Sequence, residues 1–355
     1  MSKAQSHPGR EKLATFLHIS DLHIGQLDPR TGNARISPRL KAASSNNVPW
    51  VDGLLGHHGR ALEDLQSLIG ALKRATAELH LIVSGDLSCF GGVAELELAR
   101  QFIETHIDLR PPQQLLVGLE MGATALLISG NHDHWSGNHH PLGTSPSHYY
   151  GMFRAMPFTE NVDLTTARKR IAFIGIDSDE DVVKPTVDLN YRVHAIGDFL
   201  TPLGLLGNTL KAQPRNEIRI LLIHHSWDQK GPTLQMSPRS KTALEAFICS
   251  HGICAMLCGH SHHTLMQKFE ASSAAGVRDV HELRAGSATQ LDVVPIDWIT
   301  WLGMRPAKKH WRANAVLVHS IYDTRRGLEW QADVYARGRR GFKLVPKQSM
   351  TFRLA

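Results

Sequence analysis

The sequence predicts an α/β protein in which mixed sheets carry helices on their outer faces. In the first half of the chain, short apolar runs typical of buried strands alternate with stretches of helical periodicity. In the second half almost every apolar run is strand-like. Alternating strands and helices favour parallel pairing, and consecutive strands favour antiparallel pairing, so mixed sheets follow.

Composition places the chain among ordinary globular proteins. It has 355 residues, of which 42% are hydrophobic, and a formal charge of +6 from 39 basic and 33 acidic side chains. That charge permits phosphate-bearing substrates without demanding nucleic acid. The four cysteines are not spaced like a secreted disulfide scaffold, and no apolar stretch is long enough to span a membrane. We therefore expect a cytoplasmic protein with neither a membrane nor a nucleic acid as its partner.

We expect residues 1–13 to form a flexible N-terminus and residues 14–355 to form a single domain with a β-rich C-terminal part. Two inserts interrupt the predicted domain. Residues 26–59 are rich in Gly, Pro, Asn, Ser and Arg, and residues 134–150 are rich in His and aromatic residues. Long connections in a compact domain are functional or mobile. We expect the two inserts to form the rim of a pocket.

Each element is predicted from its hydrophobic pattern. The predicted strands are 15–19, 79–83, 125–128, 171–176, 218–223 and 253–258, and then 264–269, 282–291, 315–322, 328–335 and 350–354. The predicted helices, whose apolar residues recur with a helical period, are 60–73, 93–107 and 240–249. His18 lies inside the first strand and is predicted to pack in the core.

Five of these strands end in side chains that can bind metal. In chain order the residues are Asp21 with His23, Asp86, Asn131 with His132, His224, and His260 with His262. In an extended segment residues two apart point the same way, so each Asp-x-His or His-x-His pair is expected to face one point. Carboxylate, amide and imidazole ligands without a thiolate suit manganese, iron or zinc.

The number of ligands predicts two metal ions. Without His132 there are seven candidate ligands, which is too many for one tetrahedral ion. They fit two ions about 3.5–4 Å apart that share a carboxylate. Asp86 is the natural bridge, because it is a lone carboxylate between the outer sets.

Taken together these motifs resemble one known family. Asp-x-His, Gly-Asp, Gly-Asn-His-Asp, a lone His after a strand and Gly-His-x-His occur in the order seen in calcineurin-like metallophosphoesterases. The resemblance covers roughly residues 14–291. It implies a four-layer α/β/β/α sandwich of two mixed β-sheets flanked by helices, with a dinuclear metal site at the strand ends. The segment Gly85-Asp86-Leu87-Ser88, with Gly91 and the predicted helix after it, looks like the branch of small phosphodiesterases, which includes cyclic-nucleotide and glycerophosphodiester enzymes.

The resemblance also implies a role for each side chain. Asp21, His23 and His262 would hold one metal, and Asn131, His224 and His260 the other, with Asp86 and a hydroxide as bridges. The hydroxide would attack a small phosphodiester in line. His132 would protonate the leaving oxygen, with Asp133 orienting it.

Substrate contacts and two alternatives complete the prediction. Of the adjacent pair His224 and His225, only one can point into the site. We expect His224 to be the ligand and His225 to contact the substrate or to lie just behind the ligands. Trp135, His139 and His140 are predicted to contact the substrate from the rim. One alternative is a DNA exonuclease of the same superfamily, which would need a basic groove. The other is a non-catalytic scaffold, which should have lost metal ligands that are all present here.

Overall fold

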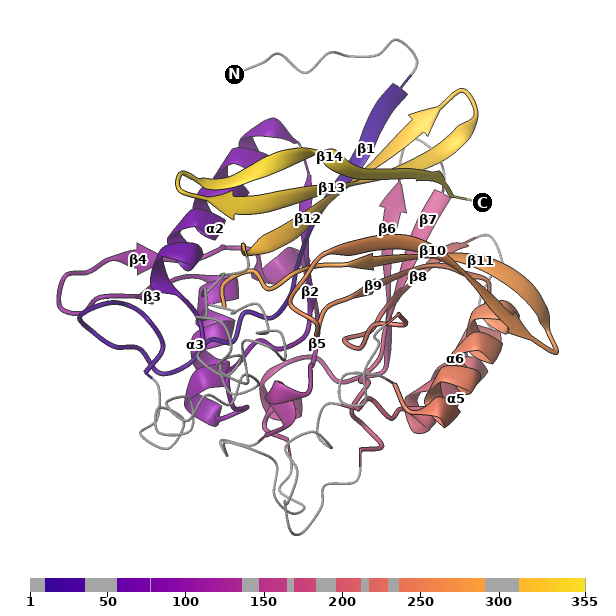
Figure 1. Cartoon of the computed structure of the whole chain (residues 1–355), viewed down its shortest axis with the longest axis horizontal. Coiled ribbons are helices and arrows are strands. Elements are labelled where there is room, and N and C mark those ends of the chain that lie inside the picture. Colours follow the sequence, from indigo (N-terminus) through magenta and orange to yellow (C-terminus); the bar gives the residue numbers. More distant parts are fainter. Residues whose placement is uncertain are drawn as a thin grey trace, which may run out of the picture.

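Two six-stranded mixed sheets form the centre of the molecule, and helices flank them (Figure 1). The computed structural model describes residues 10–35, 56–76, 78–135, 147–164, 169–182, 196–211, 217–228, 236–290 and 313–354. Within these residues, no helix is both long and apolar enough to cross a membrane.

The first sheet has the strand order β14-β13-β12-β1-β2-β5. Its strands are β1 (Arg10–Ile19), β2 (Leu79–Ser84), β5 (Ala125–Ile128), β12 (Ala315–Thr324), β13 (Gly327–Gly338) and β14 (Gly341–Arg353). β1, β2 and β5 are parallel, whereas β12 pairs antiparallel with β1 and continues into the antiparallel β13 and β14. The carboxyl ends of β1, β2 and β5 therefore lie along the same edge.

The second sheet has the order β10-β11-β9-β8-β7-β6. Its strands are β6 (Phe158–Leu164), β7 (Lys169–Gly175), β8 (Glu217–Leu222), β9 (Ile253–Cys258), β10 (Leu265–Ser273) and β11 (Gly276–Arg284). The four inner strands β7, β8, β9 and β11 are parallel, and β6 and β10 are antiparallel edges. A separate small ladder joins β3 (Ile107–Asp108) to β4 (Leu116–Val117).

Helices cover the outer face of each sheet. α2 (Gly59–Ala75) and α3 (Val93–Glu104) lie on one side of the molecule, and α5 (Leu200–Lys211) and α6 (Pro238–His251) on the other (Figure 1). Short helices are α4 (Tyr149–Met152) and the 3-10 turns η2 (Gly122–Thr124) and η3 (His132–His134).

Three apolar cores hold these layers together. Leu65 and Phe102 of α2 and α3 pack on the first sheet, Phe16 and Phe173 pack between the sheets, and Phe247 of α6 packs on the second sheet. Four layers with three cores between them confirm the predicted α/β/β/α sandwich.

The structure departs from the predicted elements in several places. β3, β4 and β6 were not predicted, and β14 begins at Gly341 rather than at residue 350. β1 begins at Arg10, and residues 10–12 already pair with β12, so residues 10–13 belong to a strand and not to a flexible N-terminus. β11 ends at Arg284, before most of the predicted strand 282–291. Helix α5 was not predicted, because Pro202 and two glycines lower its helix propensity. Pro202 is tolerated because it lies in the first turn of the helix.

Candidate metal centre

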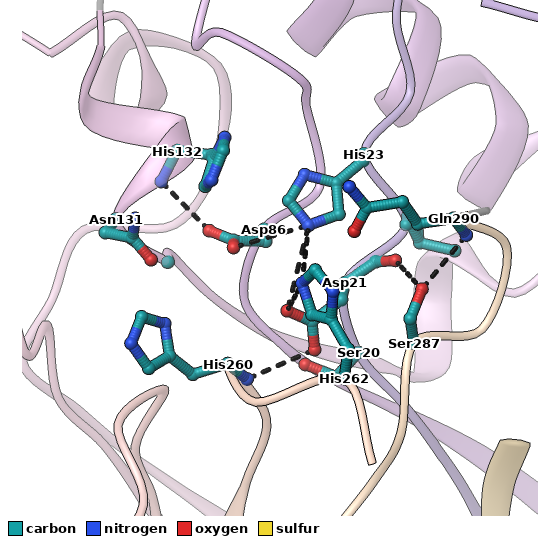
Figure 2. A network of polar contacts seen from close by, with 12 residues as sticks. Ser20, Asp21, His23, Asp86, Asn131, His132, His260, His262, Ser287 and Gln290 are labelled. Carbon is teal, nitrogen blue, oxygen red and sulfur yellow. Dashed lines mark hydrogen bonds and ion pairs between the residues drawn. The ribbon is translucent and has the colours of Figure 1, made fainter. Parts of the chain in front are cut away.

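The loops that follow the parallel strands of both sheets meet at one place. A bridge between Ser20, after β1, and Ser287, after β11, joins the two sheets there. Figure 2 shows Asp21, His23, Asp86, Asn131, His260 and His262 converging from separate loops. We call Asp21, His23 and His262 the first ligand group, and Asn131, His224 and His260 the second ligand group.

Asp86 and the first ligand group bring four possible ligand atoms together. His23 Nε2 lies 3.5 Å from Asp86 Oδ2 and 3.3 Å from His262 Nε2. His262 Nε2 lies 3.3 Å from Asp21 Oδ1. This oxygen of Asp21 is buried and has no hydrogen-bond partner among the described residues. Such a set of atoms could hold one metal ion.

The second ligand group gathers on the other side of Asp86. His224 Nε2 lies 3.3 Å from Asp86 Oδ2, 3.2 Å from Asn131 Oδ1 and 3.2 Å from His260 Nδ1. Its other nitrogen, Nδ1, is 2.7 Å from the carbonyl oxygen of Ser84. A carbonyl can only accept, so Nδ1 carries the proton, and a neutral His224 points the lone pair of Nε2 at two oxygens.

This arrangement of acceptors fits a cation. Buried hydrogen-bond acceptors that face one another repel, because their lone pairs point together. Such an arrangement is stabilised when a proton or a metal ion lies between the acceptors. In the metal-free chain a proton takes that place: burial works against it, but Asp86 outweighs burial and raises the pKa of His224 to about 10. Burial likewise favours the neutral acid of Asp86, yet His224 and His132 hold the pKa of Asp86 below its ordinary range. Carboxylate, amide and imidazole donors without thiolate match divalent metals.

The backbone of these ligands is not extended. Asp21 (φ 53°), His23 (φ 46°), Asp86 (φ 53°), His260 (φ 72°) and His262 (φ 58°) all lie in the left-handed region. The prediction that alternation along an extended segment makes each pair converge is therefore wrong, because the side chains are aimed by left-handed turns. Non-glycine residues pay about 1–3 kcal/mol for this conformation, and it persists where neighbours hold it. Here Asp21 N donates to Gly85 O and His23 N donates to Asp86 O.

Glycines precede Asp86, Asn131 and His260 because another loop packs against each of them. A Cβ atom at Gly85 would clash with the His224 ring, one at Gly130 with Asp86, and one at Gly259 with Ser20. The three Gly-ligand motifs in the sequence are thus close approaches between loops.

His132 lies over the ligands, and the structure shows what orients it. Its ring meets the His23 ring edge-on with centroids 4.6 Å apart, and its backbone N–H donates to Asp86 Oδ1 over 2.9 Å. His132 Nδ1 donates to the Cys89 carbonyl over 2.8 Å, so Nε2 is the nitrogen that can face a substrate. Burial lowers the pKa of His132 to about 4, against the opposing charge of Asp86.

Asp133 has a different role from the predicted one. Its carboxylate accepts hydrogen bonds from the backbone N–H groups of Leu87, Ser88 and Gly130 and from the Ser88 hydroxyl. None of the hydrogen bonds it accepts within the described residues comes from the His132 ring. Asp133 therefore ties the loop after β2 to the loop after β5, and the Cys89 carbonyl orients His132.

The comparison with protein families settles the family. The profile described as calcineurin-like phosphoesterase matches residues 14–264. The chain belongs to the calcineurin-like phosphoesterase family. Members of this family use divalent metal ions, so the family identifies the chain as related to metal-dependent hydrolases. No curated protein sequence gave a significant match.

Solved structures of remote similarity were also found. They include GAP50, the anchor in the inner membrane complex of Plasmodium, with 9% identity over 98% of this chain and 89% of that one (TM-score 0.44). The calcineurin-like phosphoesterase YfkN from Bacillus subtilis has 11% identity over 96% and 90% (TM-score 0.39). Phosphopantetheinyl hydrolase from Mycobacterium tuberculosis has 12% identity over 85% and 96% (TM-score 0.38). Similarities this low carry no argument about function.

Two residues are buried behind the site: Trp135, which was predicted to contact substrate, and His225, which was predicted either to contact substrate or to lie just behind the ligands. Trp135 is only 7% exposed and stacks on His132 with ring centroids 4.0 Å apart, so it supports that ring. His225 is fully buried, its ring is 4.2 Å from that of His260, and its Nδ1 is 2.7 Å from Ser178 Oγ. It therefore lies behind His260. His139 and His140 lie outside the described residues.

Sequence reasoning missed Gln290. Its side chain is fully buried, and neither amide atom has a hydrogen-bond partner among the described residues. Figure 2 shows it reaching from the loop after β11 toward His23. The Gly286-Ser287 break is the only signal in the sequence that a loop turns in here.

A charged cluster that was not predicted as part of the site lies beside η3. His134 Nε2 is 2.9 Å from Asp177 Oδ2, and the Tyr150 hydroxyl donates to the same carboxylate. Burial opposes protonation of His134, but Asp177 raises its pKa to about 9. The bond from Tyr150 to Asp177 anchors α4 to the loop after β7, while the Tyr150 side chain stays 36% exposed.

Proposed function

We propose that this phosphoesterase is a dinuclear metal-dependent phosphodiesterase. The first ligand group would hold one ion, manganese, iron or zinc, the second ligand group would hold a second, and Asp86 would be shared between them. The observation that carries the proposal is the position of Asp86 Oδ2, which is 3.5 Å from His23 Nε2 and 3.3 Å from His224 Nε2. One carboxylate oxygen between two sets of nitrogen ligands is what a pair of ions about 3.5–4 Å apart requires.

The metal ions and the residues around them would have separate roles in hydrolysis. When bound, the two cations would lower the pKa of water and neutralise the charge of the transferring phosphoryl group. Because His132 Nδ1 bonds the Cys89 carbonyl, Nε2 is the nitrogen that would donate a proton to the leaving oxygen. An anionic ester beside this ring favours its protonated form, which opposes the lowering caused by burial. The Cys89 carbonyl and Trp135 hold the ring in place.

We propose small diesters as substrates in preference to DNA. The net charge of +6 is modest for a chain of this length. Part of the basic charge, including Lys343 and Lys347, lies on β14, which is the edge of the first sheet opposite β5. The ligand loops follow β1, β2 and β5, so this charge does not line them. Trp135 and Tyr149 are buried, so neither ring supplies a stacking surface that would support this preference.

The proposal is tested by activity on defined phosphoesters. Protein loaded with manganese should hydrolyse small nucleotide or glycerol-type diesters faster than the corresponding monoesters, and exhaustive chelation should abolish turnover. Restoration by added manganese is the control for unfolding. Hydrolysis that survives complete removal of metal would overturn the mechanism. Processive degradation of linear DNA with little turnover of small diesters would instead identify an exonuclease, and a metal-loaded protein inert on every ester would identify a scaffold.

A further inference from the structure

A chain of hydrogen bonds crosses the interior of the first sheet and ends beside the metal centre. Trp330 Nε1 on β13 lies 3.0 Å from His319 Nδ1 on β12. His319 Nε2 lies 3.3 Å from His18 Nδ1 on β1, and His18 Nε2 lies 2.9 Å from the Ser84 hydroxyl on β2. All four side chains are completely buried.

The direction of every bond in this chain follows from its first member. An indole N–H can only donate, so His319 Nδ1 must be the acceptor. A neutral His319 then carries its proton on Nε2 and donates to His18 Nδ1. His18 in turn carries its proton on Nε2 and donates to Ser84 Oγ. Both rings are neutral, since burial lowers the pKa of His18 to about 3 and holds the pKa of His319 well below its ordinary value.

The far end of the chain holds a metal-ligand candidate. The carbonyl of Ser84 accepts a hydrogen bond from His224 Nδ1 over 2.7 Å and another from the Ser20 hydroxyl over 3.2 Å. Ser84 is thus held through its side chain by His18, and it holds His224 through its main chain. The partner of the second nitrogen of a metal-binding histidine fixes the tautomer and the orientation of the ring.

We propose that the β12–β13 hairpin is a positioning element of the metal centre. Trp330, His319 and His18 are positioning residues that fix Ser84, and through it the tautomer and orientation of His224. The inference rests on the proposed function in one respect, the assignment of His224 as a metal ligand. β12 and β13 lie beyond the matched family region, residues 14–264, so this support is supplied by a part of the chain that the family match does not cover.

The test is to remove the donor while keeping an aromatic ring. Trp330→Phe eliminates the indole N–H, and Phe352→Leu is the matched control. Phe352 stacks on Trp330 with centroids 6.0 Å apart, so its truncation loosens the same packing without touching the hydrogen bonds. Histidine ring nitrogens are observed by nitrogen–proton correlation NMR in metal-free protein, and manganese affinities are measured by calorimetry.

In wild-type protein and in Phe352→Leu, His18 and His319 should each show the Nε2-protonated tautomer. In Trp330→Phe both rings should populate the other tautomer as well. The affinity of the second ligand group should fall by up to about tenfold, less than when a direct partner of a ligand is lost, while that of the first ligand group stays unchanged.

Two results would overturn the proposal. One is unchanged tautomers in Trp330→Phe. The other is an affinity loss in Phe352→Leu as large as in Trp330→Phe, which would make packing the cause. If the wild-type protein bound no metal, the proposed function would fall, whereas the tautomers measured in metal-free protein would still report on the hydrogen-bond chain.

Discussion

The two ligand groups are positioned in different ways. All three members of the first ligand group, Asp21, His23 and His262, have left-handed backbone conformations. In the second ligand group only His260 does, whereas Asn131 is in the right-handed helical region at φ −63°. His224 is aimed by a hydrogen bond from its ring to the Ser84 carbonyl at the end of a buried strand.

This difference shows where each group is vulnerable. The first ligand group depends on strained turns that neighbouring loops hold in place, so changes in loop packing should disturb it. The second ligand group depends on the core between the sheets, through Ser84 and the hydrogen bonds behind it. Asp86 belongs to both, because its carboxylate touches His23 and His224.

Asp86→Asn should have the largest effect, because it damages both groups at once. The substitution keeps the shape of the side chain and removes the negative charge shared by two cations. We expect hydrolysis to fall by more than about 10³-fold, beyond the loss from removing a single electrostatic donor. Metal content, measured by mass spectrometry after dialysis, should fall to one ion or fewer. Retention of two ions per chain would show that Asp86 is not the bridge.

His132→Ala separates catalysis from metal binding in both groups. The rate on diesters with poor leaving groups should fall by roughly 10²–10⁴-fold, and the loss should shrink for nitrophenyl esters, which need no proton. Metal content should stay near that of the wild type. If it collapses, His132 is a ligand and not the general acid.

Paired glycine substitutions sharpen the comparison between the groups. Gly85→Ala places a methyl group against His224, and Gly259→Ala places one against Ser20, next to Asp21. Each should destabilise the fold by about 1–3 kcal/mol and weaken the ligand group that it touches more than the other. The control is Gly204→Ala in α5, where a Cβ meets nothing within 4 Å, and it should stabilise the helix by about 0.5–1 kcal/mol. Equal loss of both affinities in the two variants would show that the groups are not positioned independently.

Glu95 should give the smallest and most specific effect, a pH dependence of stability. It accepts a hydrogen bond from Phe90 N, next to the Cys89 carbonyl that holds His132, and burial raises the pKa of Glu95 to about 7. Between pH 4.5, the ordinary pKa of this carboxyl, and pH 7, the unfolded chain releases the Glu95 proton and the folded chain keeps it. The contribution of Glu95 to the free energy of unfolding should therefore be greatest below about pH 4.5 and fall as pH rises to 7, by at most about 3 kcal/mol.

Glu95→Gln should remove this dependence. The measurement is urea unfolding at pH 5 and pH 8 with a chelator present, so that proton release on metal binding does not contribute. Exposed Glu270→Gln is the control and should keep the wild-type slope. A slope that is the same in Glu95→Gln and in the wild type would contradict the assignment.

The sequence predicted which residues come together in the site, but not the backbone conformations that bring them together. The fold and the convergence of Asp21, Asp86 and His224 could be predicted, because parallel strands deliver their carboxyl ends to one edge. The left-handed turns could not be read, since nothing in the local sequence of Asp21 or His262 demands a positive φ. That conformation is imposed by contacts with other loops.

The roles of the residues that pack behind the candidate metal ligands were harder still to predict. Asp133, Trp135 and His225 have the chemistry of site residues, but tertiary packing places them behind the residues that face the site. His18 was predicted to be an ordinary core histidine, and its burial agrees with this. Its link to Trp330 depends on β12 and β13, some 300 residues away along the chain, and no local pattern carries that information.

The central claim is that two ions share Asp86, and it is tested most directly by electron paramagnetic resonance of protein loaded with Mn²⁺ at a counted stoichiometry. The account predicts two manganese ions per chain with the spectrum of a spin-coupled pair, and only uncoupled manganese in Asp86→Asn. A wild-type protein that binds a single ion, or two ions with no coupling, would contradict it.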